Sequence, residues 1–323
     1  MLRPMLIGYR VALTFCLSPL DPVPARPWFV VLLAGVLIGF WPLKAAGEPK
    51  IDTPPRPETS DIKGSLVIVG GGMLPESIRD RFLELAGGKK SAKLVVIPTA
   101  SALADRTQNY KSYAYWRAQG MESVQLLNTL DQKKANDPTF VKPLTEATAA
   151  WLGGGDQTRL AGAYRGTAVE RELRRLLDRG GVIGGTSAGA SVMSAVMITG
   201  GNPQARIGTG FGLLPDVVID QHFENRRRQN RLLGVLSQCP RCLGLGIDEQ
   251  TAVVVHGHTF TVVGKANVVV CLPPGDGVPA VVQQVLRPGE VGDLLIFSRS
   301  ALARSKPPME RKAQASSDRQ TMP

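Results

Sequence analysis

Histidine is scarce in this sequence, which has only three histidines among 323 residues, and cysteine occurs only four times. Aromatic residues make up 6% of the chain, and no run of Lys and Arg is interleaved with them. Proteins that bind single-stranded nucleic acid combine a basic groove with aromatic residues on which the bases stack. We therefore expect no nucleic-acid partner, although the formal net charge is +11.

The few cysteines do not form a metal-binding pattern. Cys239 and Cys242 make a single C-x-x-C pair, whereas a structural zinc site needs four ligands. No second pair or neighbouring histidine cluster supplies the others, so no metal site is expected. A redox role is also disfavoured, because the pair follows a helical stretch without a thioredoxin-like setting. A short disulfide is the interpretation that suits an exported chain.

An apolar run near the N-terminus, from Trp28 to Trp41, is shorter than the ~20 residues that a membrane-spanning helix needs. Arg26 precedes the run and small residues follow it at 45–47, which is typical of a secretory signal. We therefore interpret residues 1–47 as an export signal and expect a periplasmic or extracellular protein. The alternative is an uncleaved anchor, which would tether the domain to a membrane.

Composition divides the rest of the chain. Residues 48–64 are polar and rich in proline, which predicts a linker, and residues 299–323 are basic and poor in apolar residues, which predicts a disordered tail. Between them, residues 65–298 alternate short apolar runs with amphipathic stretches. Such runs are typical of parallel strands buried on both faces. We predict a single α/β domain, with a largely parallel, doubly wound sheet and helices on both faces.

Turns that contain glycine follow three of the predicted strands. They include residues 70–72, residues 153–155 and the stretch "GGTSAGA" at 184–190. Ligands of open parallel sheets bind beyond the carboxyl ends of the strands, so we expect these turns to line one edge. The later apolar runs, up to residue 272, predict a more antiparallel continuation of the same sheet.

Ser187 is the candidate nucleophile, because Gly185 and Gly189 complete a G-x-S-x-G frame at a strand-to-helix turn. A serine hydroxyl needs a base to remove its proton, and histidine is the usual base. His256 and the nearby third histidine, at 258, lie in a predicted hairpin turn, whereas His222 ends an apolar strand. His222 is therefore the candidate base.

Backbone donors and an acid complete the candidate set. The N–H of Ala188 would bind the developing oxyanion, with the N–H of Gly154 or Gly155 as the second donor. Asp248 and Glu249 end a later strand and are the best-placed acids to orient the histidine. Neighbouring strand residues point to opposite faces, so only one of the two can serve, and their spacing leaves both open.

Several arginines follow the candidate base in a predicted helix. Arg228 and Arg231 are i, i+3 neighbours on one face, and Arg226 lies near the start of the helix. Cations near a helix N-terminus are electrostatically unfavourable. They indicate either a site that binds carboxylates through guanidinium groups or simply a solvated basic face.

Four ordered motifs now form a recognisable combination: "GGGDQ", "GGTSAGA", "DQHFxxRxRxxRL" and "GIDEQTA". They resemble those of cyanophycinase and the related peptidase E-like serine hydrolases, over about residues 65–271. The resemblance implies a class I glutamine amidotransferase-like fold, with Ser187 as nucleophile, His222 as base and Glu249 as orienting acid. It also implies that the substrate pocket is shaped by Gln157, Asp220, Gln221, Arg226, Arg228 and Arg231.

The same resemblance implies a reaction. Cyanophycin is a poly-aspartate that carries arginine on each side-chain carboxyl, and its hydrolysis would release β-Asp-Arg dipeptides without a metal or cofactor, in a homodimeric enzyme. The chain order Ser–His–Glu differs from that of α/β-hydrolases, which disfavours an ordinary esterase. Two alternatives remain: an aspartyl dipeptidase acting on short acidic peptides, and a non-catalytic envelope binding protein.

Overall fold

The computed structural model describes residues 62–104 and 111–305, which all belong to one compact unit, Pro49–Pro323. The export segment predicted at 1–47 lies outside the described residues, as do nearly all of the predicted linker and residues 306–323 of the predicted tail. None of the helices in the described ranges combines the length and apolarity needed to cross a bilayer.

The larger sheet has eight strands in the order β14-β11-β10-β1-β5-β4-β2-β3. Its parallel part consists of β1 (Ile62–Val69), β2 (Lys93–Ile97), β3 (Ser123–Leu126), β4 (Ala149–Leu152) and β5 (Val182–Thr186). The antiparallel part consists of β10 (Thr251–Gly257), β11 (Thr259–Gly264) and β14 (Val291–Asp293). The predicted largely parallel sheet is confirmed.

Helices cover both faces of this sheet, as predicted. Leu66 and Ile68 of β1 belong to one apolar core with residues of α3 (Pro138–Glu146), α4 (Gln157–Tyr164) and α5 (Ala168–Asp178). Val67 and Val69 belong to a second core with residues of α1 (Glu76–Leu85) and α2 (Lys111–Arg117). A one-turn 3-10 helix, η1 (Lys134–Asn136), precedes α3. Successive strand side chains point to opposite faces, so β1 is buried between two helical layers.

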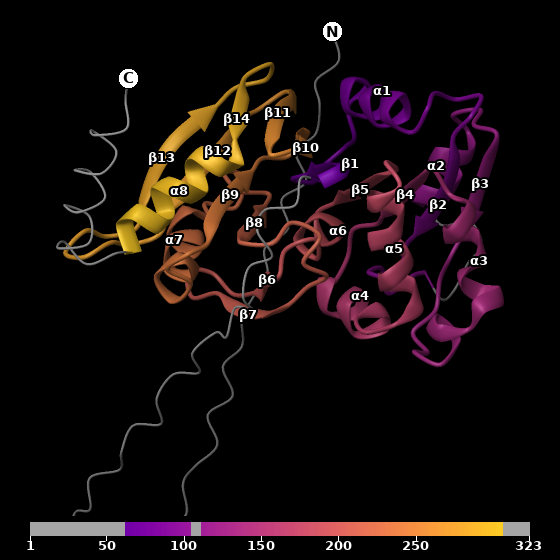
Figure 1. The fold of residues 1–323 in the computed structure, drawn as a ribbon, viewed down its shortest axis with the longest axis horizontal. Helices are drawn as coiled ribbons and strands as arrows, with labels where there is room; N and C mark the ends of the chain where they lie inside the picture. Colours follow the sequence, from indigo (N-terminus) through magenta and orange to yellow (C-terminus); the bar gives the residue numbers. More distant parts are fainter. Residues whose placement is uncertain (1–61, 105–110, 306–323) are drawn as a thin grey trace, which may run out of the picture. The chain divides into compact units, whose positions relative to one another are not determined.

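The prediction that the later apolar runs all continue the same sheet is wrong for several of them. A separate four-stranded sheet contains β8 (Val217–Gln221), β9 (Leu243–Ile247), β12 (Val268–Leu272) and β13 (Val281–Leu286), in the order β13-β12-β9-β8. Figure 1 shows it beside the larger sheet, with α7 (Gln229–Gln238) near it and a hairpin of β6 (Val196–Gly200) and β7 (Arg206–Thr209) below. Strands that are apolar on both faces carry no signal that tells which sheet they join.

The predicted boundary of the tail at residue 299 is also wrong. The helix α8 (Leu294–Ser305) runs across it, and Leu294, Phe297 and Ala301 are buried along one side of this helix. Their i, i+3, i+7 spacing is enough to hold a helix against the core, although the segment is poor in apolar residues overall. Of the predicted tail, residues 306–323 lie outside the described part.

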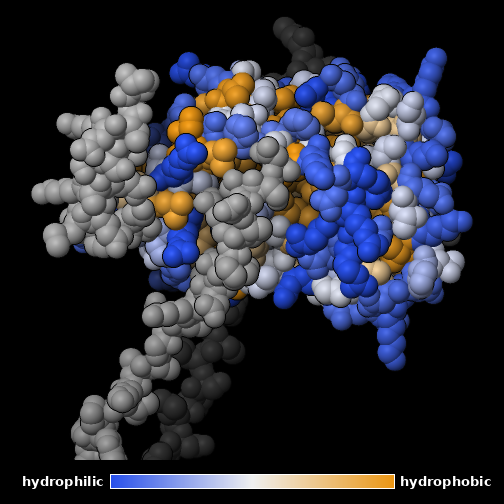
Figure 2. Space-filling model, in the orientation of Figure 1, coloured by the Kyte–Doolittle hydropathy of each residue, from blue (hydrophilic) through white to orange (hydrophobic). Residues whose placement is uncertain are grey.

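Apolar side chains that remain exposed are scattered, for example Val285 on β13, Val291 on β14 and Ile296 on α8. The face seen in Figure 2 is mainly hydrophilic, with separate apolar patches. Single exposed apolar residues are normal on a protein surface. The predicted disulfide between Cys239 and Cys242 is present at the end of α7.

Candidate active site

Ser187 lies in a sharp turn between β5 and α6 (Ala188–Ser191), with φ 53° and ψ −110°. The two glycines of its frame permit that turn. A Cβ on Gly185 would lie 2.4 Å from the carbonyl oxygen of Gly189, and a Cβ on Gly189 would lie 2.2 Å from that of Leu152. Only glycine fits at such close approaches, so the local sequence produces a strand–turn–helix that exposes the serine at the sheet edge.

The structure brings the candidate nucleophile, base and acid together in one hydrogen-bonded chain. Ser187 Oγ lies 2.9 Å from His222 Nε2, and His222 Nδ1 lies 2.5 Å from Glu249 Oε1. His222 directly follows β8, and its N–H donates to the carbonyl oxygen of Gly70 over 2.7 Å. Side chains from three separate strand ends therefore meet at the edge that the sequence predicts.

The turn at 70–72 holds the histidine in place, a role that sequence reasoning missed. A Cβ on Gly71 would lie 2.3 Å from His222 Cε1, and a Cβ on Gly72 would lie 3.1 Å from Glu249 Cβ. The Gly71 carbonyl also accepts the Gln250 N–H over 2.8 Å. The three consecutive glycines after β1 were the available signal, because such a run allows backbone to pack directly on side chains.

The two acids that the sequence leaves open have different positions. Glu249 contacts the imidazole, while Asp248 is buried and its Oδ1 accepts the N–H of Glu224 over 2.6 Å. Burial raises the pKa of Asp248 above its usual range. Asp248 thus fastens the turn that follows His222, and Glu249 is placed to orient the ring, which agrees with the alternation of strand side chains.

The electrostatic surroundings keep the imidazole neutral. Burial lowers the pKa of His222 below its ordinary value, and the charges of Arg226 and Arg228 lower it further, while the hydrogen bond to Glu249 opposes them. A neutral imidazole can accept the proton of Ser187. Glu249 can then stabilise the imidazolium that forms.

Backbone donors lie beside the serine. Ala188 begins α6, so its N–H belongs to the first-turn groups that have no partner within the helix. A Cβ on Gly154 would lie 3.6 Å from Ser187 Cβ, which puts this residue next to the nucleophile. Gly155 has φ 143° and packs on Ala100. Of the two glycines, Gly154 is therefore the better-placed second donor for an oxyanion.

Asp220 and Arg231 form a buried ion pair instead of lining an open surface. They are 1% and 3% exposed, and Arg231 Nε donates to Asp220 Oδ2 over 2.9 Å, with a second contact from the guanidinium to Oδ1. Arg231 also donates to the carbonyl oxygen of Gly201 over 2.9 Å. Burial raises the pKa of Asp220, which the two neighbouring arginines oppose. The polar atoms of Asp220 and Arg231 bond to each other and to the Gly201 backbone. We therefore regard the pair as structural support for the site.

The other predicted pocket residues differ in how deeply they are buried. Arg228 donates to the backbone and side-chain oxygens of Gln221, and its buried Nε has no partner in the described part. Burial and the neighbouring Arg231 lower the pKa of Arg228 to about 10. Arg226 is exposed. Gln221 and Gln157 are buried, and Gln157 donates to the carbonyl oxygen of Ile198 over 2.8 Å.

The predicted helix after His222 begins later than expected. It starts at Gln229, so Arg226 lies in the preceding turn and Arg228 caps the helix. Arg227 has φ 50° in that turn. Three adjacent cations at a helix N-terminus are unfavourable, which is a physical reason for the chain to remain in a turn here.

A serine that contacts a histidine, which in turn contacts a carboxylate, is typical of hydrolases with a serine nucleophile on an α/β sheet. Comparison with known proteins identifies the family: the model of Peptidase family S51 matches residues 66–263. The chain belongs to Peptidase family S51 and is a serine-type peptidase.

Known relatives and a solved structure agree with this family. The cyanophycinase of Geminocystis herdmanii (strain PCC 6308) is 34% identical over 225 residues, 65% of this chain and 80% of the relative. That of Thermosynechococcus vestitus (strain NIES-2133 / IAM M-273 / BP-1) is 35% identical over 225 residues, 65% of this chain and 69% of the relative. A crystal structure of a peptidase from an acI-B1 Actinobacterium superposes with a TM-score of 0.56 at 26% identity, covering 71% of this chain and 96% of the other. The resemblance that the motifs carry is confirmed.

Proposed function

We propose that this peptidase hydrolyses cyanophycin and releases β-Asp-Arg dipeptides. The observation that carries the proposal is the hydrogen-bonded chain Ser187–His222–Glu249 directly beside an arginine-rich turn. The cyanophycinase relatives, matched over 69% or more of their length, support the choice of substrate. Each unit of the polymer offers a carboxylate, on its arginine, that guanidinium groups can bind bidentately.

The geometry supports a two-step acyl transfer. His222 Nε2 takes the proton of Ser187 as Oγ attacks the carbonyl carbon, and the N–H groups of Ala188 and Gly154 stabilise the oxyanion. His222 then gives the proton to the leaving amine. Water, deprotonated by the same histidine, cleaves the acyl-enzyme and restores the serine.

The arginine turn is the proposed recognition element. Arg226 is exposed, whereas Arg228 is half-buried and donates to the backbone oxygen of Gln221, which ties the turn to the end of β8. Glu224, also exposed in this turn, can pair with the guanidinium of the substrate. The buried pair Asp220–Arg231 holds the turn against the protein, so that these groups face the substrate in a fixed arrangement.

Incubation of the full chain with cyanophycin, followed by mass analysis of the products, tests this function. We expect β-Asp-Arg to accumulate, and we expect Ser187→Ala to reduce the rate by several powers of ten, as in other triad enzymes (~10⁴–10⁶-fold). Faster turnover of α-aspartyl dipeptides than of the polymer would instead indicate an aspartyl dipeptidase. Intact polymer together with no labelling of Ser187 by a serine-reactive probe would indicate a binding protein.

We also propose that the protein acts outside the cytoplasm. The disulfide Cys239–Cys242 supports this location, because disulfides persist mainly in oxidising compartments. Fractionation of cells that express the full chain, compared with a variant lacking residues 1–47, measures the effect of that segment. Equal distribution of both forms would contradict an export signal.

A further inference from the structure

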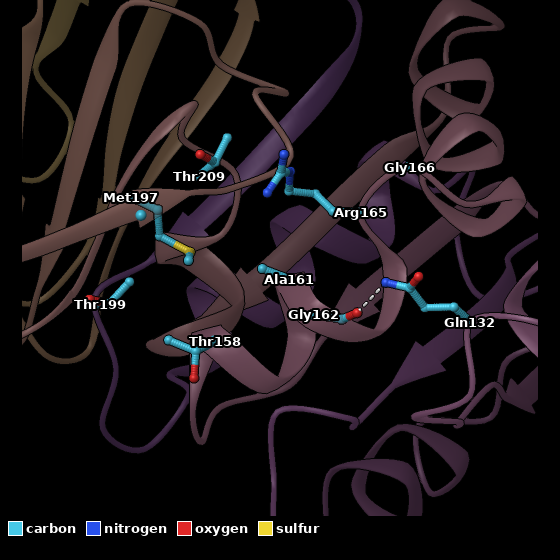
Figure 3. A pocket seen from close by; sticks show the side chains of 10 residues that line it. Gln132, Thr158, Ala161, Gly162, Arg165, Gly166, Met197, Thr199 and Thr209 are labelled. Carbon is cyan, nitrogen blue, oxygen red and sulfur yellow. Dashed lines mark hydrogen bonds between the residues drawn. The ribbon is translucent and has the colours of Figure 1, made fainter. Parts of the chain in front are cut away.

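A hollow with a mixed polar and apolar lining lies between α4 and the β6–β7 hairpin (Figure 3). We call it the α4–β7 hollow; its lining includes Thr158, Gly162, Arg165, Met197, Thr199 and Thr209. It encloses about 430 Å³, within the range of ~300–1,000 Å³ that is usual for ligand pockets. None of its ten described lining residues belongs to the hydrogen-bonded triad or to the predicted substrate pocket.

The free polar groups of the hollow suit an anion. Arg165 is the only charged residue among the described lining residues, and its exposed guanidinium makes no ion pair within the ranges 62–104 and 111–305. Figure 3 shows Arg165 extending from the end of α4 toward Thr209 on β7. The hydroxyls of Thr158 and Thr199 already donate to protein oxygens. A guanidinium and a hydroxyl therefore remain to bind a carboxylate.

A glycine inside α4 keeps the hollow open. Gly162 lies within the helix, where glycine is less stable than alanine, yet a Cβ there would meet nothing within 4 Å. Its carbonyl oxygen accepts the side-chain amide of Gln132 over 2.7 Å, as the dashed line in Figure 3 shows. Packing does not require glycine at this position, and the lack of a side chain there leaves more space in the hollow.

The hollow adjoins the element that carries the nucleophile. Met197 and Thr199, which line it, flank Ile198. The Ile198 carbonyl accepts Gln157 Nε2 over 2.8 Å and Ser191 Oγ over 3.3 Å, and Ser191 ends the short helix α6. The eight residues of α4 span about 12 Å, a distance that about four extended residues of a bound chain would cover at ~3.3 Å each.

We propose that the α4–β7 hollow is a second binding site for a polymeric substrate, in which Arg165 and Thr209 bind the free carboxylate of a unit several residues from the bond that is cut. The proposal rests on the proposed function, because every cyanophycin unit carries such a carboxylate on its arginine. A site of this kind raises affinity for long chains and not for substrates of one or two units.

The test compares variants on a long and a short substrate. Arg165→Gln removes the guanidinium, and Gly162→Gln places a longer side chain and a better helix former in the lining of the hollow. Arg287→Gln removes an exposed arginine from the turn after β13 and serves as a matched control. Affinity for surface-bound cyanophycin is measured in a Ser187→Ala background, which prevents turnover. KM is measured in the active background for cyanophycin and for a two-unit fragment.

We expect Arg165→Gln and Gly162→Gln each to weaken polymer binding about fivefold. The KM for cyanophycin divided by the KM for the two-unit fragment should rise by the same factor. The effect of Arg165→Gln should shrink in 0.5 M salt, because exposed charges are then screened (Debye length roughly 4–5 Å). Suppose that the wild-type protein hydrolyses the polymer. Unchanged polymer affinity in both variants, or an equal loss of affinity in Arg287→Gln, would then overturn the second site but not the proposed function. Polymer left intact by the wild-type protein would overturn the proposed function, and this inference with it.

Discussion

Substitution of Gly71 by alanine should inactivate the enzyme without unfolding it. The new Cβ would lie 2.3 Å from His222 Cε1 and 2.5 Å from Nε2, whereas ordinary van der Waals contact begins near 3.4 Å. The imidazole must therefore move by about 1 Å, the difference between these distances. Such a displacement breaks the alignment with Ser187 Oγ, which now lies 2.9 Å from Nε2.

A misplacement of about 1 Å costs roughly 10²-fold in rate, or about 2.7 kcal/mol of transition-state stabilisation. We expect this loss in kcat, with a smaller change in KM, measured by release of dipeptide from cyanophycin. Labelling of Ser187 by a serine-reactive probe should slow in parallel, because the same base activates the serine.

Backbone strain needs its own control, because Gly71 has φ 118°. Gly88 has φ 81°, and a Cβ there would meet nothing within 4 Å, so Gly88→Ala introduces left-handed strain of about 1–2 kcal/mol without a contact. Thermal unfolding should show a loss of this size in Gly88→Ala and a loss at least as large in Gly71→Ala, while only Gly71→Ala loses activity. A folded Gly71→Ala enzyme with wild-type kcat would refute the steric argument.

Three further outcomes test the electrostatics of the site. Glu249→Gln should lower kcat by ~10⁴-fold, as for the acid of other triads, and rates within tenfold of wild type would count against its role. Arg226→Gln removes a cation that lowers the pKa of His222; the pKa should rise, so the acid limb of the profile of kcat/KM against pH should move to higher pH, and a shift to lower pH would contradict the assignment. Asp220→Ala leaves the buried Arg231 unpaired and should lower the free energy of unfolding by about 3–5 kcal/mol in chemical denaturation, whereas a loss below 1 kcal/mol would show that water already reaches the pair.

The contact between Ser187 and His222 was predictable from the sequence because histidine is scarce. Of three histidines, only His222 ends a buried strand, and a buried strand end is where an α/β site forms. Spacing alone did not separate Asp248 from Glu249, because alternation shows that one of them faces the histidine but not which. The decision depends on the three-dimensional path of the 70–72 turn, against which both residues pack.

Other features depended on tertiary contacts that no local pattern encodes. The strands β8, β9 and β12 are buried along their whole length, so their composition is the same whether they extend one sheet or build a second. The burial of Arg231 was equally unpredictable from the sequence. Its i, i+3 relation to Arg228 suggested a shared exposed face, but Asp220, a residue on a different element, draws Arg231 into the interior.

The arginine-rich stretch contains both a buried and a half-buried arginine, which pair with Asp220, and exposed arginines beside His222. Asp220 is the one carboxylate that the structure pairs with these arginines, within 4.0 Å of both Arg231 and Arg228 in the described part of the chain. One negative charge cannot neutralise both, and Arg226 and Arg227 add two exposed cations. The turn therefore keeps an excess of positive charge beside a histidine whose pKa is already lowered. These cations add to the effect of burial, which is the main cause of the lowered pKa of His222. The same guanidinium groups could bind a carboxylate of the proposed substrate, so recognition and proton transfer would then depend on one cluster of side chains.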